Sequence, residues 1–253
     1  MNSTPAISSS QNEFVKMARS LQDKKGREEQ GAFLVEGEKC VHELLTHSPQ
    51  TLRALIVTPE YQQDSLALTE SLGKRIVIVE PRIMKAICDC VTPQNVAAVA
   101  DVSEPAEIMS GFIVAMDDVA DPANVGTIIR TADAAGCAGV VLSNACADSH
   151  SPKAVRASMG SLFHLPVIRT NLSSCLEELR LRDYEIACAD LKGTEDFCLN
   201  AENTCVVIGN ESRGISEEIL KLATTRIRIP IYGKAESLNA AVAAGILIYK
   251  IRT

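Results

Sequence analysis

Tryptophan is absent from this chain of 253 residues, and aromatic residues of all kinds make up 4% of it. The longest apolar stretch, near Ala240–Tyr249, is too short for the roughly 20 residues of a transmembrane helix, so we predict a buried helix there and no membrane partner. Residues 1–11 are rich in serine and lack both the arginines of a transit peptide and the apolar run of a signal peptide. We therefore expect a flexible N-terminus and a cytoplasmic protein.

Patterns typical of a disulfide framework or a metal site are also missing. The nine cysteines are odd in number and lie in a large chain, which favours a reducing compartment. Cys88 and Cys90 lack the C-x-x-C spacing of a zinc site, and the four histidines are scattered. We expect no bound metal.

Positive charge is in deficit, because 25 Lys and Arg residues face 32 Asp and Glu residues, for a net charge of −7. This balance argues mildly against a nucleic-acid partner, since such binding depends on Lys and Arg. Residues 16–27 differ, because their charged residues are basic except for Asp23, namely Lys16, Arg19, Lys24, Lys25 and Arg27. A positive RNA-binding surface is one interpretation of this stretch, and a solvated charged turn is the other.

The length suits two domains of ordinary size. Residues 12–100 combine an amphipathic helix after Asn12 and a second helix expected over 38–45 with short strands expected over 32–36, 54–58 and 75–80. This combination is typical of a small α/β domain. Residues 101–110 contain Pro105 and predict a linker. Over residues 111–253, short apolar runs alternate with helical patterns, which predicts an α/β fold with a mostly parallel sheet. The strands are expected at 112–116, 139–142, 185–189, 205–208 and 226–231. Ligands in such sheets bind beyond the carboxyl ends of the strands, so three loops at these ends are the candidate ligand-binding segments.

The first loop follows a strand that ends at Met116 and leads into a helix expected over Thr127–Ala135. Asn124 and Gly126 lie where unpaired backbone N–H groups favour a phosphate or ribose. Arg130, four residues after Gly126, is placed to face such a ligand. Taken alone, the same residues fit an N-cap and a surface ion-pair partner.

The second loop has the sequence GNESRG over residues 209–214, and its two glycines permit close approach of a ligand to the backbone. Its spacing is similar to that of a phosphate-binding P-loop, but Ile215 stands where the P-loop lysine is required. No G-x-G-x-x-G follows any expected strand. These two absences argue against a nucleotide hydrolase and a conventional dinucleotide site, and leave an ordinary strand-to-helix turn as the alternative.

The third loop precedes an alanine-rich helix that contains Val242, Ile246 and Tyr249, with Ser237 as its expected N-cap. Four alanines within residues 240–244 would let this helix pack closely against another element. By itself, this feature has an ordinary structural explanation.

Together and in this order, the three loops resemble the SpoU (TrmH-like) family of RNA ribose methyltransferases. The matching motifs are Asn124-Val-Gly126-Thr-Ile-Ile-Arg130, Gly209-Asn-Glu211-Ser-Arg-Gly214, and Ile229-Pro230 followed by Ser237-Leu238-Asn239. Weaker similarity extends to DSHSPKAVRASMG at residues 148–160 and to NEFVKMARSL, FLVEG and TPQNVAAV in the N-terminal part. The N-terminal part resembles the RNA-recruiting domain of members that modify guanosine in 23S rRNA.

The resemblance implies an α/β knot, in which the C-terminal segment of the sheet domain is threaded into a deep trefoil, an exception to the usual rule against knots. It implies that the knot loops bind S-adenosylmethionine, with Gly209, Ile229, Leu238 and Asn239 in the cofactor-binding site. It also implies a homodimer formed through the knot region.

The resemblance further implies methyl transfer to a ribose 2′-hydroxyl and gives the catalytic role to Arg130. Because a guanidinium is a poor base, Arg130 acts either as an assisted base or as a group that orients the hydroxyl and stabilises developing negative charge. Asn124 is expected to position the ribose or phosphate. Glu211 and Asn239 are expected to fix the loops or contact the substrate.

Four basic residues are candidate RNA contacts. Lys153 and Arg156 lie at an expected helix start, and Lys16 and Arg19 lie in the basic stretch. Solvated surface charge is the alternative for all of them. Two alternatives to a 23S rRNA enzyme also stay open, namely a tRNA 2′-O-methyltransferase and a non-catalytic RNA-binding protein that retains the fold.

Overall fold

The chain forms two compact units in the computed structural model. The structure describes residues 5–65, 72, 75–104, 107–108 and 110–253. The first unit consists of Met1–Glu104 and His150–Phe163, and the second consists of Pro105–Ser149 and His164–Thr253.

The change of unit after Glu104 falls inside the predicted linker, residues 101–110. One segment differs from the prediction of a continuous catalytic domain over 111–253, because residues 150–163 return to the first unit. The physical reason is that helix α8 (Pro152–Ser158) packs against the sheet of the first unit. The composition of a linker gives no sign of such a long-range contact.

The first unit is built on a four-stranded sheet in the order β1-β4-β2-β3. Its strands are β1 (Ala32–Glu36), β2 (Leu52–Val57), β3 (Ile76–Ile78) and β4 (Val96–Asp101). Strand β4 is an interior strand of the sheet and pairs antiparallel with both neighbours. It was not among the predicted strands. Residues 96–100 are all buried, so they form a continuous Val and Ala run without the alternation that marks a half-exposed strand.

Helices cover both faces of this sheet. They are α1 (Glu13–Ser20), α2 (Lys24–Gln30), α3 (Glu38–His47), α4 (Pro59–Asp64), α6 (Pro81–Ile87) and α8 (Pro152–Ser158), with 3-10 turns at Pro49–Thr51 and Ser161–Phe163. The predicted amphipathic helix is confirmed as α1, which begins where the Asn12 side chain accepts a hydrogen bond from the Phe14 amide and buries Val15 and Ala18.

Helix α8 is held in the first unit by apolar packing. Val155 is 1% exposed and joins a core that includes Phe33, Val41 and Leu44. Full burial of one such side chain stabilises a fold by about 1.5–3 kcal/mol. Residues 150–163 therefore fold with the N-terminal sheet although they are distant from it in the sequence.

An ion-pair cluster adds to this packing. The Arg156 guanidinium lies 3.1 Å from the Glu36 carboxylate and 2.7 Å from that of Asp89. Burial alone would lower the pKa of Arg156, but hydrogen bonds and charge from Asp89 and Glu36 raise it. The predicted contact between Arg156 and an RNA phosphate would require both ion pairs to break, so it remains a prediction without support from this geometry.

The second unit contains a six-stranded sheet in the order β10-β8-β9-β5-β6-β7. Its strands are β5 (Ile113–Met116), β6 (Gly139–Ser143), β7 (Val167–Thr170), β8 (Glu185–Thr194), β9 (Thr204–Ile208) and β10 (Thr225–Ile227). All five strand pairings are parallel, which confirms the predicted parallel sheet. The edge strand β7 was not predicted, because its partly exposed residues form no apolar run.

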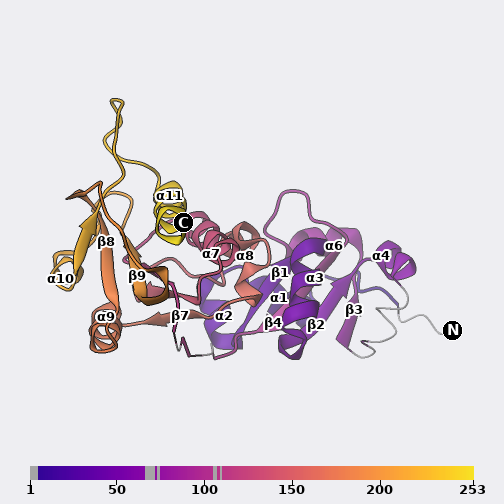
Figure 1. Ribbon diagram of the computed structural model, residues 1–253. Coiled ribbons are helices and arrows are strands. Elements are labelled where there is room, and N and C mark those ends of the chain that lie inside the picture. Colours follow the sequence, from indigo (N-terminus) through magenta and orange to yellow (C-terminus); the bar gives the residue numbers. More distant parts are fainter. Residues whose placement is uncertain (1–4, 66–71, 73–74, 105–106, 109) are drawn as a thin grey trace. The chain divides into compact units, whose positions relative to one another are not determined.

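Helices also cover both faces of this second sheet (Figure 1). They are α7 (Pro122–Ala134), α9 (Leu172–Leu181), α10 (Glu217–Leu220) and α11 (Ala240–Arg252), with a 3-10 turn at Ala201–Asn203. Leu176 of α9 and Ile219 of α10 belong to the core on one face. Helix α11 packs beside α7 and against β9.

Two predicted helix starts are wrong. Helix α7 begins at Pro122, five residues before the expected start, because the Asp121 carboxylate accepts the Ala123 amide at 2.9 Å and proline suits a first turn. The N-cap of α11 is Asn239 rather than Ser237, since the Asn239 side chain accepts from the amides of Ala241 and Val242.

The connection from β10 to α11, coloured yellow, projects away from the sheet of its own unit (Figure 1). Its residues 232–239 are all exposed. The chain leaves the sheet at the edge strand β10 and returns to an interior strand of the same sheet, because α11 contacts β9. Among the described residues, no helix is long and apolar enough to cross a membrane.

The Arg156 cluster leads to a prediction about stability. We expect Arg156→Met to lower the free energy of unfolding by about 2 kcal/mol, because the Glu36 carboxylate, 5% exposed, would lose its counter-ion. Urea denaturation followed by circular dichroism measures this change. The matched control Arg82→Met removes an exposed pair with Glu80 and should cost less than about 0.5 kcal/mol. Equal costs for the two variants would contradict a stabilising role for the Arg156 cluster.

Candidate functional site

The first and second loops are neighbours at the carboxyl end of the parallel sheet. Strands β5 and β9 pair in register through Met116 and Ile208, so the loops that follow them start side by side. The Asp117 amide donates to the Ile208 carbonyl at 2.8 Å, and the Asp117 carboxylate accepts the Ser216 amide at 2.7 Å. This adjacency is the one expected for ligand sites in such sheets.

The carboxylate of Glu211 in the second loop binds the first loop directly. It accepts hydrogen bonds from the amides of Ala120 and Asp121 at 3.1 and 3.3 Å and from the Asn124 side chain at 2.8 Å. Two of these donors are backbone N–H groups just before α7, where a negative charge also interacts favourably with the helix dipole. The expectation that Glu211 fixes loops agrees with this geometry.

The third loop joins the same network through Asn239. Its side-chain NH2 group donates to the Asn124 side-chain oxygen at 3.0 Å. Asn124 is 8% exposed and therefore uses both ends of its amide, one toward Glu211 and one toward Asn239. Three residues that are far apart in the sequence, one from each motif, form a single hydrogen-bonded chain.

These contacts keep Glu211 ionised. Burial alone would raise the pKa of Glu211, but the hydrogen bonds from Asn124 and from the backbone amides of Ala120, Glu211 and Asp121 lower it below its ordinary value. At neutral pH the side chain is an acceptor only. Its structural contacts occupy both carboxylate oxygens, which favours a loop-fixing role over proton transfer.

The second loop has a tight, preformed backbone. Asn210 and Gly214 exchange two backbone hydrogen bonds at 3.0 and 2.9 Å, and the Asn210 side chain donates to the Asp118 carbonyl at 2.8 Å. A side chain at Gly209 would place its first carbon 2.4 Å from the backbone of Gly214 and Ile215, so the bend requires glycine there. Gly214, at φ +70°, instead faces open space.

Ser143 and Asp118, which were not among the predicted site residues, support the first loop. The Ser143 hydroxyl, at the end of β6, donates to the Asp118 carboxylate at 2.7 Å and accepts the Asp118 amide at 2.9 Å. Asp118 has φ +57°, an uncommon conformation that these bonds stabilise. The available signal was position alone, because Ser143 ends β6 and Asp118 follows the end of the neighbouring parallel strand β5 by two residues.

Arg130 lies outside the hydrogen-bonded network. It is exposed on α7, and in the described part of the chain its guanidinium has no hydrogen-bond or ion-pair partner. Gly126 is buried one turn earlier. The guanidinium is therefore available to a ligand, and its predicted catalytic role stays a prediction.

The predicted cofactor residues fit S-adenosylmethionine in chemical type. Ile229 is half-buried and Leu238 is 36% exposed, so apolar surface is available for a flat adenine ring. Gly214 faces open space, so its backbone has no side-chain cover, which suits hydrogen bonds to the polar edges of a ligand. Asn239 is anchored to Asn124 and begins α11, so its expected cofactor contact is indirect in this geometry.

The remaining candidate RNA contacts lie in the first unit. Lys16 and Arg19 are exposed on α1, and Lys153 is exposed on α8. Their exposure permits phosphate contacts but does not require them.

Comparisons with known proteins match the two parts of the chain separately. The model of the SpoU rRNA Methylase family matches residues 111–249, and the model of the MRM3-like substrate binding domain matches residues 12–98. The curated 23S rRNA (guanosine(2553)-2′-O)-methyltransferase RlmP of Bacillus subtilis (strain 168) is 36% identical over 248 residues, which cover 97% of this chain and 98% of that protein.

Two solved structures are similar over nearly the whole chain. An AdoMet-bound rRNA methyltransferase from Sinorhizobium meliloti has a TM-score of 0.87 at 32% identity, covering 98% of this chain and 97% of that one. The SpoU methyltransferase AviRb from Streptomyces viridochromogenes, in complex with AdoMet, has a TM-score of 0.84 at 28% identity, covering 95% and 98%. These similarities confirm the predicted fold class, an α/β knot with a smaller N-terminal domain.

The Glu211 contacts lead to a prediction about pH. We expect Glu211→Gln to lower the free energy of unfolding by about 1 kcal/mol at neutral pH, because the amide cannot accept from all three donors. Since the folded-state pKa lies below the ordinary value of 4.5, this difference should be complete above pH 4.5 and shrink as the pH falls below it. Urea titrations from pH 7 to pH 3 measure it, and a difference independent of pH would exclude the charge as its cause.

Proposed function

The chain belongs to the SpoU rRNA methylase family, and from this membership we propose that it transfers a methyl group from S-adenosylmethionine to a ribose 2′-hydroxyl of RNA, most specifically at a guanosine of 23S rRNA. The observation that carries the proposal is the chain of hydrogen bonds from Glu211 through Asn124 to Asn239. It joins all three motifs into one preformed site at the carboxyl end of the sheet.

In the proposed mechanism, S-adenosylmethionine supplies an electrophilic methyl group on its sulfonium. Gly209, Ile229 and Leu238 would hold the cofactor, and the protein lowers the barrier by keeping hydroxyl and methyl group in line. Arg130 orients the 2′-hydroxyl and stabilises the negative charge that develops on its oxygen. Because a guanidinium is a poor base, this role is favoured over that of a base. As the O–CH3 bond forms and the S–CH3 bond breaks, the cofactor leaves as a neutral thioether and the hydroxyl proton passes to solvent water.

The first unit is proposed to recruit the RNA. It carries 13 Lys and Arg residues against 14 Asp and Glu residues, whereas the second unit carries 12 against 18. The acidic excess therefore lies mainly in the second unit, and the nearly neutral first unit repels phosphates less. Lys16, Arg19 and Lys153 are the proposed phosphate contacts.

The choice of 23S rRNA over tRNA is supported by the relative RlmP, whose name gives guanosine 2553 of 23S rRNA as its target and which aligns with 97% of this chain. The match of residues 12–98 to a substrate-binding domain adds to this choice. A guanosine in 23S rRNA is therefore the proposed substrate, and the cytoplasm is its proposed location.

A homodimer through α11 is proposed from the exposed face of this helix. Ala244, Leu247 and Ile248 are buried within the unit. Val242 and Ile246, by contrast, are 51% and 42% exposed, as is Tyr249 at 47%, and their spacing of four and three residues places them on one helical face. An apolar face left uncovered in a single chain suits an isologous contact with a second copy.

The central experiment incubates the purified protein with methyl-labelled S-adenosylmethionine and unmodified total RNA, then locates the label by nuclease digestion. We expect label on a 2′-oxygen of 23S rRNA, and Arg130→Ala should reduce transfer about 100-fold or more while leaving cofactor affinity unchanged. Label on tRNA would keep the chemistry and overturn the substrate. Wild-type rates for Arg130→Ala would remove Arg130 from the mechanism, and cofactor binding without any label would favour a binding-only protein.

The dimer is tested by a charge in the exposed face of α11. We expect Ile246→Glu to halve the mass measured by sedimentation equilibrium, because a carboxylate would be buried without a partner. The control Thr127→Glu adds the same charge at an exposed position on α7 and should leave the mass unchanged. A monomeric wild-type protein at micromolar concentration would contradict the proposal.

A further inference from the structure

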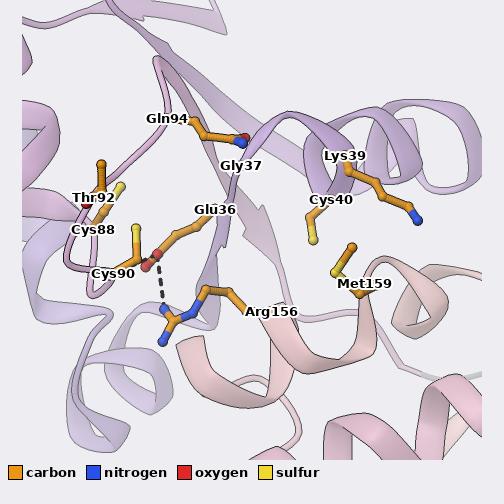
Figure 2. A pocket seen from close by; sticks show the side chains of 10 residues that line it. All are labelled: Glu36, Gly37, Lys39, Cys40, Cys88, Cys90, Thr92, Gln94, Arg156 and Met159. Atoms are coloured by element: carbon orange, nitrogen blue, oxygen red, sulfur yellow. Dashed lines mark hydrogen bonds and ion pairs between the residues drawn. The ribbon is translucent and has the colours of Figure 1, made fainter.

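The first unit contains a cavity that the proposed methyl transfer does not use (Figure 2). It lies among the turn from β1 into α3, the loop that precedes β4, and the end of α8. Its volume of 270 Å³ is slightly below the range of about 300–1,000 Å³ typical of sites for drug-sized ligands. A single flat ring system is the kind of group that this space suits.

The one carboxylate at the floor of the cavity is hydrogen-bonded and paired. Glu36 is buried there, and its carboxylate accepts the amides of Asp89 and Cys90 at 2.8 and 3.3 Å as well as the Arg156 guanidinium at 3.1 Å. Asp89 is paired with the same guanidinium. The buried Glu36 carboxylate is therefore paired and hydrogen-bonded, and Asp89, which shares its guanidinium, is not among the residues that line the cavity.

Sulfur-bearing side chains form much of the wall. Figure 2 shows Cys40 and Met159 turned toward each other across the cavity, with Cys88 on another side. Burial raises the pKa of the Cys40 and Cys88 thiols, so both stay neutral. Met159 ends α8 at φ +53°, an uncommon conformation for a residue with a side chain. Neutral, polarizable sulfur contacts aromatic rings favourably.

Polar side chains stand at the edge of the cavity. The Gln94 oxygen accepts the Glu38 amide at 2.6 Å, which leaves its NH2 group to donate to a ligand. Lys39 extends away from the floor (Figure 2), and in the described part of the chain its ammonium forms no ion pair or hydrogen bond. A cation in this place can contact a phosphate on either side of a base held in the cavity.

We infer that this cavity binds one unpaired nucleobase of the RNA, with Met159 and Cys40 against the ring face, Gln94 at its polar edge and Lys39 on the adjacent phosphate. This inference rests on the proposed function, because RNA is the ligand that the first unit is proposed to recruit. Sequence-specific recognition of RNA mostly targets unpaired bases that leave the helical stack. The cavity is too small for a helix but admits such a base.

The test measures binding rather than methyl transfer. A fluorescein-labelled hairpin RNA with a mixed-sequence single-stranded loop is titrated with full-length protein by anisotropy, beside the same stem closed as a blunt duplex. Two variants change the cavity, Met159→Ala and Lys39→Gln. Met159→Leu keeps the apolar bulk and Lys85→Gln removes an exposed lysine of α6, so these two serve as matched controls.

We expect Met159→Ala and Lys39→Gln each to weaken hairpin binding about fivefold, with duplex binding unchanged. Lys39→Gln should also reduce the salt dependence of hairpin binding by about one phosphate contact. Met159→Leu and Lys85→Gln should bind as the wild type does. Unchanged melting temperatures and cofactor affinities for all four variants show that the fold is intact.

Hairpin binding unaffected by both cavity variants would overturn the inference, as would an equal loss of hairpin and duplex binding. Competition by free guanosine monophosphate as strong as that by the hairpin would overturn it in favour of a small-nucleotide site. The labelling experiment above tests the proposed function separately. Cavity-dependent hairpin binding without any methyl transfer would leave this inference standing and remove the enzyme proposal.

Discussion

The hydrogen bonds that Glu211 accepts hold the candidate site together. Its carboxylate binds the first loop through two backbone amides and through Asn124, and Asn124 in turn holds Asn239 at the start of α11. Asn124 is the common partner of the other two motifs, since its NH2 group donates to Glu211 and its oxygen accepts from Asn239. The preformed arrangement leaves little loop entropy to be lost when a cofactor binds.

A second constraint determines what the N-terminal unit contains. Val155 and Arg156 of α8 add an apolar core side chain and a counter-ion for the buried Glu36 to a unit built otherwise from residues before 105. The same ion pair neutralises Glu36 at the floor of the sulfur-lined cavity. One short helix, from the middle of the methylase sequence, therefore completes both the core of this unit and the wall of the inferred nucleobase cavity.

Several features were predictable because they depend on local sequence. The helix after Asn12, the strand at residues 32–36 and the parallel sheet follow from apolar spacing. Strand β4 and the start of α7 were missed for local reasons as well, since a fully buried Ala and Val run has no alternation and Asp121 was not recognised as a cap. For the candidate site, the sequence predicted the three motifs but not the hydrogen bonds that connect them.

The sequence by itself determined which functional groups the site contains, namely the three family motifs, the glycines of the second loop, and Arg130 four residues after Gly126. Only the tertiary structure decided which of these groups form hydrogen bonds or ion pairs with one another. Glu211 is a structural acceptor and Arg156 is a paired cation because their partners come from residues 87 and 120 positions away. Hydrogen bonds and ion pairs act over about 3 Å in space and carry no signature in sequence spacing when the chain folds back over such distances.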